Sequence, residues 1–203
     1  MNPVSHETGQ GFDSLGVSRG YNIHDKAFYK TLWKIDKWDF APEVREQAEA
    51  DMRAGMSKLA LIEKYGIESY IGKESIEGNL LLNEGINSIW TLVAGGSETA
   101  FNNANARLGV GDSNTAEAAS QTDLQASTNK LFKAMDASYP TYGTSQKITF
   151  RSTFGSSEAN YAWQEFSVDN GSTPLKNLNR KVSAQGTKTS GQTWQLTLDI
   201  TLS

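Results

Sequence analysis

The chain contains no cysteine, and this absence excludes disulfide bonds and thiolate metal sites. Histidine is almost as scarce: His6 and His24 are the only two, and neither has a carboxylate at a recognised metal-binding spacing. A histidine-based zinc site or a histidine general base is therefore not expected. We predict that the protein uses no metal and no cofactor.

Long hydrophobic runs are also lacking. A membrane-spanning helix requires about 18 consecutive apolar residues, and no stretch of the chain approaches this length. Met1–Gly20 has neither the basic start nor the apolar block of a secretory signal. We therefore expect no membrane partner and no secretion.

A basic excess, which nucleic-acid-binding modules usually show, is absent from both halves of the chain. The residues before Ser97 carry 14 Asp and Glu against 10 Lys and Arg, and the residues from Ser97 onward carry 9 of each. The net charge of −4 thus belongs to the first half. We expect no nucleic-acid partner, and we interpret the polar second half as a surface suited to contact with other proteins.

The clearest pattern is the strict alternation of apolar and polar residues from Trp194 to Leu202. A period of two is typical of a half-buried β-strand. The apolar face must pack on upstream segments, for which Lys147–Phe154 and Tyr161–Val168 are candidates. Further strands are predicted at 106–110 and 178–184. Short strands separated by polar turns favour an α+β, mainly β fold: an antiparallel, jelly-roll-like β-sandwich with a few helices.

Helices are predicted at four places. Pro42–Arg53 begins with a proline suited to the first helical position. Lys58–Tyr65 follows Ser57 as N-cap and ends at a glycine. Asn79–Ala94 has an apolar stripe of helical spacing, which favours a helix covering one face of a sheet over a partner-binding helix. Thr122–Met135 has apolar residues on one side.

The N-terminal region is predicted to be an extended arm, residues 1–40. Its first part is rich in glycine and has few apolar residues, and its last part crowds aromatic residues into a short charged stretch. These aromatic residues either pack on the protein's own core or anchor a partner surface, because Trp and Tyr are enriched at interface hot spots. The candidate partner-binding residues are Phe28, Tyr29, Trp33, Trp38 and Phe40. A small helical segment, 41–77, and a sandwich domain, 78–203, complete the predicted organisation.

Chemical motifs are weak. Glu158 and Glu165 could form the carboxylate pair of a glycoside hydrolase, although many β-proteins meet this test. Asp112, Asn114 and Glu117 are oxygen donors at short spacing, but the EF-hand pattern is absent and a turn is favoured over a calcium site.

Two further motifs favour structural interpretations. Gly109-Val-Gly111 lacks the third glycine of a dinucleotide loop, so we interpret it as a strand ending in a turn. Trp163 and Trp194 are interpreted as core residues rather than a carbohydrate platform. We predict no catalytic residue.

A series of blocks carries a resemblance to a known family. The blocks, in order, are Gly78–Asn87, Asn102–Ser113, Lys133–Pro140, Thr149–Phe154, Glu158–Glu165, Leu178–Lys181 and Gly186–Lys188. Together they resemble small proteins encoded in the virion-structure modules of tailed bacteriophages and prophages. The resemblance covers about residues 78–203 and leaves the N-terminal region outside.

The resemblance implies a non-enzymatic virion structural protein assembled in the host cytoplasm. We expect a capsid decoration or cement protein that is anchored to neighbouring subunits through its N-terminal arm. The alternatives are a tail- or fibre-associated structural or receptor-binding protein and, third, a glycan hydrolase. The expected partners are other virion proteins, either the major capsid protein or tail proteins, and copies of the same chain in a homo-oligomer or symmetric array. Deletion of residues 1–40 is expected to leave residues 97–203 folded.

Overall fold

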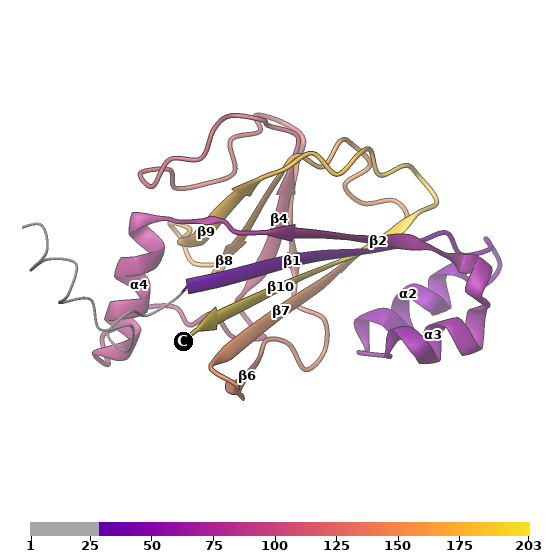
Figure 1. The fold of residues 1–203 in the computed structure, drawn as a ribbon, viewed down its shortest axis with the longest axis horizontal. Helices are drawn as coiled ribbons and strands as arrows, with labels where there is room; N and C mark the ends of the chain where they lie inside the picture. The colour runs from indigo at the N-terminus through magenta and orange to yellow at the C-terminus, as the bar shows by residue number, and fades with distance from the viewer. Residues whose placement is uncertain (1–28) are drawn as a thin grey trace, which may run out of the picture.

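The computed structural model describes residues 29–203, which form a mainly β structure with two antiparallel five-stranded sheets (Figure 1). The first sheet has the order β2-β1-β10-β7-β6 and the second the order β3-β9-β8-β4-β5. The strands of the first sheet are β1 (Tyr29–Trp38), β2 (Tyr70–Glu77), β6 (Thr141–Thr144), β7 (Lys147–Phe154) and β10 (Thr193–Leu202). Those of the second are β3 (Leu80–Leu81), β4 (Arg107–Gly111), β5 (Lys130–Ala134), β8 (Glu165–Asp169) and β9 (Asn177–Val182).

Strand β10 is central to the first sheet, and this confirms the strand predicted from its alternation. It pairs with β1 on one side and with β7 on the other. Trp194, Leu196, Leu198 and Ile200 are buried in the core shared by both sheets. Of the two expected partners, 147–154 is therefore the neighbouring strand, whereas only the end of 161–168 is a strand, β8, and it lies in the opposite sheet.

Strand β1 shows that the prediction of an extended N-terminal arm was wrong for residues 29–38. Tyr29–Trp38 lies between β2 and β10, with Trp33 and Ile35 fully buried. The period of two in these residues is a strand signal, which the crowding of aromatic residues obscures. Residues 29–38 are thus not part of an arm. Deleting them would remove an inner strand, so residues 97–203 are no longer expected to stay folded alone.

The expected domain boundary at residue 78 is also corrected. Strand β2, at 70–77, completes the same sheet as β10, so the predicted helical segment 41–77 and the sandwich share one sheet. Helices α2 (Arg45–Arg53) and α3 (Lys58–Tyr65) and the short 3-10 helix η2 (Ile67–Ser69) form the excursion between β1 and β2.

This helical excursion has its own small core. Trp38 stacks on Phe40 with ring centroids 5.3 Å apart, and both rings pack with Met52 and Leu61. Ser57 caps α3 as predicted, because its hydroxyl oxygen accepts a hydrogen bond from the backbone N–H of Ala60 at 3.2 Å. Helix α2 begins three residues later than Pro42 and has no side-chain cap.

Helix α4 (Asn83–Val93) is shorter than predicted, and its apolar stripe is only partly covered. Ile89 packs against the main core, whereas Trp90 is 64% exposed and Val93 is 71% exposed. The helix thus docks at the end of the sandwich rather than covering a sheet face (Figure 1). Its close approach to β9 requires Gly85, because a Cβ there would overlap the backbone of Leu178.

The helix predicted at 122–135 is absent, and this prediction was wrong. Residues 130–134 form strand β5, which pairs with β4. The preceding Ser127, Thr128 and Asn129 favour turns over a continuing helix, because their side chains compete for backbone hydrogen bonds. Gly109 on β4 then faces the ring of Phe132 so closely that any side chain at position 109 would overlap it.

Trp163 is the centre of the main core, and Trp163 and Trp194 are core residues as expected. Trp163 is fully buried and meets Phe154 and Trp194 edge to face, each with ring centroids 4.9 Å apart. Its indole N–H donates to the carbonyl oxygen of Ala159 at 3.0 Å. Edge-to-face aromatic pairs add to the stabilisation from burial.

Among residues 29–203, no helix has the length and apolar character that a membrane-spanning helix requires.

Candidate functional site

The aromatic residues proposed as partner anchors are mostly internal. Trp33 is 0% exposed, and Trp38 and Phe40 are each 1% exposed, all within the protein's own cores. Tyr29 is partly buried beside Asn79 and Asn179, and burial raises the pKa of its hydroxyl. Phe28 lies outside the described residues. The structure therefore corrects the proposal for Trp33, Trp38 and Phe40, which no partner can reach in the folded chain.

A fully buried ion pair lies on the outer face of the second sheet. Phe166 on β8 faces the core, so the preceding Glu165 points to the opposite face. The Glu165 carboxylate accepts from Nε and Nη2 of Arg180 on β9, at 2.8 and 2.7 Å. Both side chains are 0% exposed.

The β4–β5 loop (residues 112–129) seals this pair. Backbone N–H groups of Gln125 and Ala126 donate to the Glu165 carboxylate at 2.8 and 2.7 Å. Arg180 donates back to the loop, to the carbonyl oxygen of Thr115 at 2.9 Å and to Oε1 of Gln121 at 3.0 Å. The pair therefore fixes the loop across the sheet, and buried charges of this kind need such complete pairing.

Gly111 explains part of the Gly109-Val-Gly111 motif. A Cβ at position 111 would overlap the Glu165 carboxylate. The glycine thus leaves space for a charged group on the neighbouring strand, as the strand interpretation of the motif implies.

A second polar network fastens residues before β6 to the outer face of the first sheet. Asp136 is 2% exposed and accepts from the backbone N–H and the hydroxyl of Thr153, both at 2.9 Å. The side-chain amide of Gln195 donates to it at 3.1 Å and Nε of Arg151 at 3.2 Å. Every partner of this carboxylate is a donor, so the network holds the segment to β7 and β10.

A buried lysine holds the loop between β7 and β8. Lys188 is 0% exposed, and its Nζ donates to the carbonyl oxygens of Gly155 and Glu158 at 2.7 and 2.9 Å and to Oδ1 of Asn160 at 2.8 Å. Burial lowers the pKa of Lys188 to about 8. The ammonium group has three acceptors for its three protons, so it is fully satisfied.

Glu49 joins the helical excursion to the same loop. Its carboxylate accepts from the backbone N–H of Ser156 at 2.6 Å, from the hydroxyl of Thr193 at 2.9 Å and from Arg53 at 3.0 Å. Burial acts to raise the pKa of Glu49, but these hydrogen bonds outweigh it and hold the pKa below its usual value. Glu49 therefore fastens α2 to the sandwich.

The carboxylates considered for glycoside hydrolysis are both engaged. Glu165 is sealed from solvent, as described above. Glu158 pairs with Lys133 and accepts from the backbone N–H of Gly155 at 2.8 Å, and these hydrogen bonds lower its pKa although burial acts to raise it. A substrate bond cannot lie between Glu158 and a carboxylate enclosed by protein, so the arrangement does not form a hydrolytic pair.

The expected turn after β4 is also engaged in structural contacts. Asp112 accepts from the side-chain amide of Asn129 at 2.7 Å, and Glu117 accepts from the backbone N–H of Val182 at 2.5 Å. Across residues 29–203 no three His, Cys, Asp or Glu side chains gather as a metal site would require. His6 and His24 lie outside that range.

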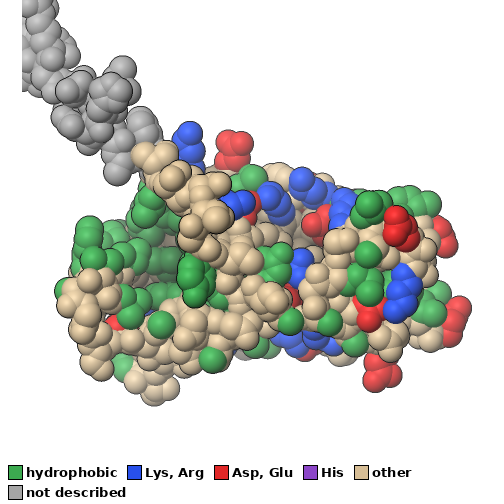
Figure 2. Space-filling view, turned by 90° about the horizontal axis from the view of Figure 1, so that it is seen from below, with side chains coloured by type: hydrophobic (Ala, Val, Ile, Leu, Met, Phe, Trp, Pro, Cys, Tyr) green, Lys and Arg blue, Asp and Glu red, His purple; other side chains and the backbone are tan. Residues whose placement is uncertain are grey.

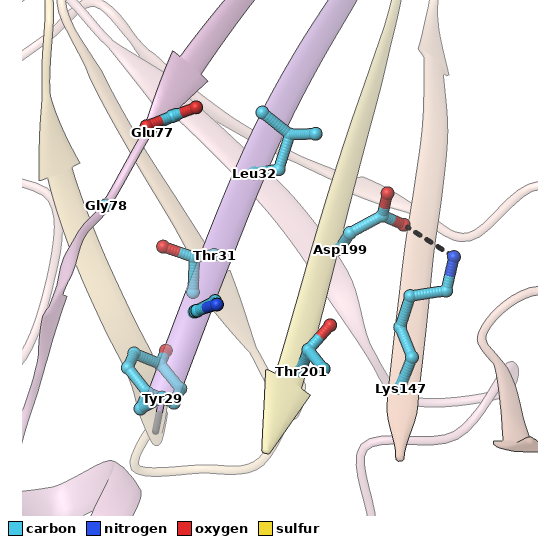
Figure 3. Close-up of a pocket in the computed structure, with 9 residues that line it drawn as sticks. Tyr29, Thr31, Leu32, Glu77, Gly78, Lys147, Asp199 and Thr201 are labelled. Carbon is cyan, nitrogen blue, oxygen red and sulfur yellow. Dashed lines mark ion pairs between the residues drawn. The ribbon is translucent and has the colours of Figure 1, made fainter. Parts of the chain in front are cut away.

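A shallow groove of about 550 Å³ lies over the ends of β1, β2 and β10 (Figure 3). Glu77 and Asp199 are the two carboxylates of this groove, and Asp199 accepts from Lys34 and from the hydroxyl of Thr149, each at 2.6 Å, with Lys147 at 3.9 Å. These contacts lower the pKa of Asp199, although burial acts to raise it. The groove is thus a polar surface in which Asp199 is already paired with lysine side chains.

The outer surface shows no dominant charge on the face seen in Figure 2, where acidic and basic side chains are interspersed among uncharged ones. The chemistry of the described residues therefore concentrates in buried networks that hold loops on the sandwich. The sequence signal for Arg180 and Asp136 is weak, and both stand out only as charged residues within the blocks that carry the family resemblance.

Comparisons of the chain with protein-family models, with curated proteins and with solved structures found no match.

Proposed function

We propose that this protein is a non-enzymatic structural component of a tailed-bacteriophage virion, and first a capsid decoration or cement protein. The family resemblance described above motivates the proposal. Its partners would be the major capsid protein and further copies of the same chain, arranged in the symmetric array that a virion imposes. We also propose that the sandwich has a jelly-roll-like form, and that the protein resides in the virion.

The observation that carries the proposal is the structural role of the residues within the resembling blocks. Arg180 and Glu165 form the sealed ion pair, Asp136 fastens the segment before β6, and Lys188 holds the β7–β8 loop. Each of these charged groups is used to fix a loop on the sandwich. Charged groups that are fully occupied in holding loops on a rigid scaffold support a structural role better than a catalytic one.

Attachment to the particle is assigned to the residues that precede β1. The burial of Trp33, Trp38 and Phe40 removes them from the anchor, so the proposed arm shortens to residues 1–28. A cement protein binds the assembled shell in preference to free subunits, and it stabilises the shell by mass action. The arm would supply this binding, while the sandwich remains outside.

The test is incorporation of a tagged chain lacking residues 2–26, which leaves β1 intact. Its unfolding transition should match that of the full chain, and it should be absent from purified particles. Normal loading of the shortened chain would show that the arm does not attach it. The full-length tagged chain supplies the control for tagging.

Immunogold labelling of particles that carry the full chain distinguishes the head from the tail. Label over the head is the expected result. Label confined to the tail would overturn the decoration role in favour of a tail- or fibre-associated protein. Binding of purified protein to host cells but not to bare heads would assign it a receptor-binding role instead.

A further inference from the structure

Within residues 29–203, one edge of strand β2 pairs with no other strand and presents backbone hydrogen-bonding groups to the surface. The strand ends the first sheet, and its other side pairs with β1 (Figure 1). Lys73, Ser75 and Glu77 are exposed, and Ile71 is 50% exposed. The strand holds no proline, but it carries Lys73 and a register shift at Tyr70–Gly72, features that discourage unselective pairing of sheet edges, so a partner strand must complement its charges.

The direction of these backbone groups follows from the ladder with β1. Gly78 donates its N–H to the carbonyl oxygen of Thr31 at 3.1 Å, which makes these opposed residues a hydrogen-bonded pair. In an antiparallel ladder such pairs alternate with pairs whose N–H and C=O groups point away. The alternation directs the backbone groups of Lys73, Ser75 and Glu77 to the free edge.

We propose that two copies of this chain pair through β2, antiparallel and across a two-fold axis at Ser75. The first sheet of one copy then continues into the first sheet of the other copy. In this register Lys73 of each copy lies opposite Glu77 of the other, so that two complementary charge pairs form. Ser75 lies opposite Ser75 and Lys73 opposite Glu77, and the backbone N–H and C=O groups of these three residues all point away from β1, towards the second copy.

Charge distinguishes this register from those centred at Lys73 or Glu74, and the register at Ser75 brings both Lys73 residues opposite a Glu77. A two-fold axis at Lys73 or at Glu74 would place identical charges opposite each other, which is destabilising. The ion pair on this strand within the described residues joins Glu74 to Lys37 and leaves Lys73 and Glu77 available. Along one strand Lys73 and Glu77 are separated by roughly 13 Å, so each requires a second copy for the pairing.

This pairing rests on the proposed function in one respect: it names the β2 edge as the surface for the self-association expected there. It can nevertheless be measured on the purified chain, without virus particles. Its failure would leave particle incorporation unaffected, and failed incorporation would leave this pairing unaffected. The two proposals are therefore tested separately.

The test is sedimentation equilibrium of the full-length protein and of charge-swap variants. The native chain should dimerise reversibly. Lys73→Glu and Glu77→Lys should each weaken dimerisation about 10-fold, because each converts two attractive contacts into repulsive ones. The double variant should recover to within about 3-fold of the native constant, because the charges are exchanged but still complementary.

A backbone variant provides an independent measurement. Ser75→Pro removes an N–H that points away from β1, at an edge position where proline is tolerated. It should abolish dimerisation while circular dichroism stays that of the native fold. A native chain that is monomeric at all concentrations would overturn the proposal. A dimerisation constant that is unchanged by substitutions at Lys73, Ser75 and Glu77 would also overturn it. So would a dimer that is lost only when residues 2–26 are removed.

Discussion

The sealed Glu165–Arg180 pair gives the sharpest prediction, because every hydrogen-bond partner of Glu165 is a donor. In Glu165→Gln the new amide must place its NH₂ group against Arg180 or against a backbone N–H of the β4–β5 loop. Arg180 would also lose its counter-ion while remaining buried. Removing one member of a buried ion pair costs about 3–5 kcal/mol of the free energy of unfolding.

The expected change in melting temperature follows from the chain length. One kcal/mol corresponds to roughly 2–4 °C for chains of 150–250 residues, so a decrease of about 6–20 °C is expected. The matched control is Glu158→Gln, whose ion pair with Lys133 is partly exposed and should contribute about 1 kcal/mol or less. Replacing both Glu165 and Arg180 by apolar residues should cost less than the sum of the two single changes.

Urea unfolding followed by tryptophan fluorescence measures these differences, because Trp163 and Trp194 lie in the main core. Amide hydrogen exchange provides the local measurement. In Glu165→Gln, the backbone amides of Gln125 and Ala126 should lose protection while the amides of β10 keep it. Equal costs for the Glu165 and Glu158 variants, or unchanged exchange at both loop amides, would refute the role assigned to the pair.

Three further predictions concern the other fastenings. Gly111→Ala should destabilise the protein by about 1–3 kcal/mol in urea unfolding, because the added methyl group displaces the Glu165 carboxylate; a neutral result would contradict the close packing of the two residues. Because the pKa of Glu49 is lowered on folding, its contribution is fully present above the unfolded value of about 4.3 and is lost as pH falls through the lowered pKa. On acidification, amide hydrogen exchange should therefore rise in α2 before it rises in β10. The Glu49→Gln variant should already show the faster exchange in α2 at neutral pH. Simultaneous loss of amide protection in both elements would argue against a local attachment. Lys188→Met should cost about 2–4 kcal/mol, since it leaves buried acceptors without a donor, and the prediction fails if its thermal unfolding matches that of the native chain.

Local patterns sufficed for the elements that depend on neighbouring residues in the chain. The alternation of Trp194–Leu202 specifies a strand with one buried face, and β10 has this form. The Ser57 cap and Gly66 likewise fix the ends of α3, because both act within a few residues of the helix. The overall class, mainly β with antiparallel strands, followed from the number and spacing of such segments.

Long-range pairing decided what the local patterns left open. Residues 29–38 have the period of a strand, but only pairing with β10, at the other end of the chain, makes them an inner strand instead of an arm. Residues 130–134 become β5 because β4 offers a glycine against which the Phe132 ring can pack. A single segment has no information about which strand will lie beside it.

The same distinction applies to the candidate site. The sequence identifies Glu165 as a carboxylate on a strand, and this residue type suits either catalysis or an ion pair. Its role depends on Arg180 and on the β4–β5 loop that closes over both residues. Periodicity and capping are properties of the local chain, whereas the burial of a charge depends on which distant segments cover it. For this protein the sequence therefore determined strand β10, the ends of α3 and the mainly β class, and the tertiary structure determined the strand pairing and which charged groups hold the loops in place.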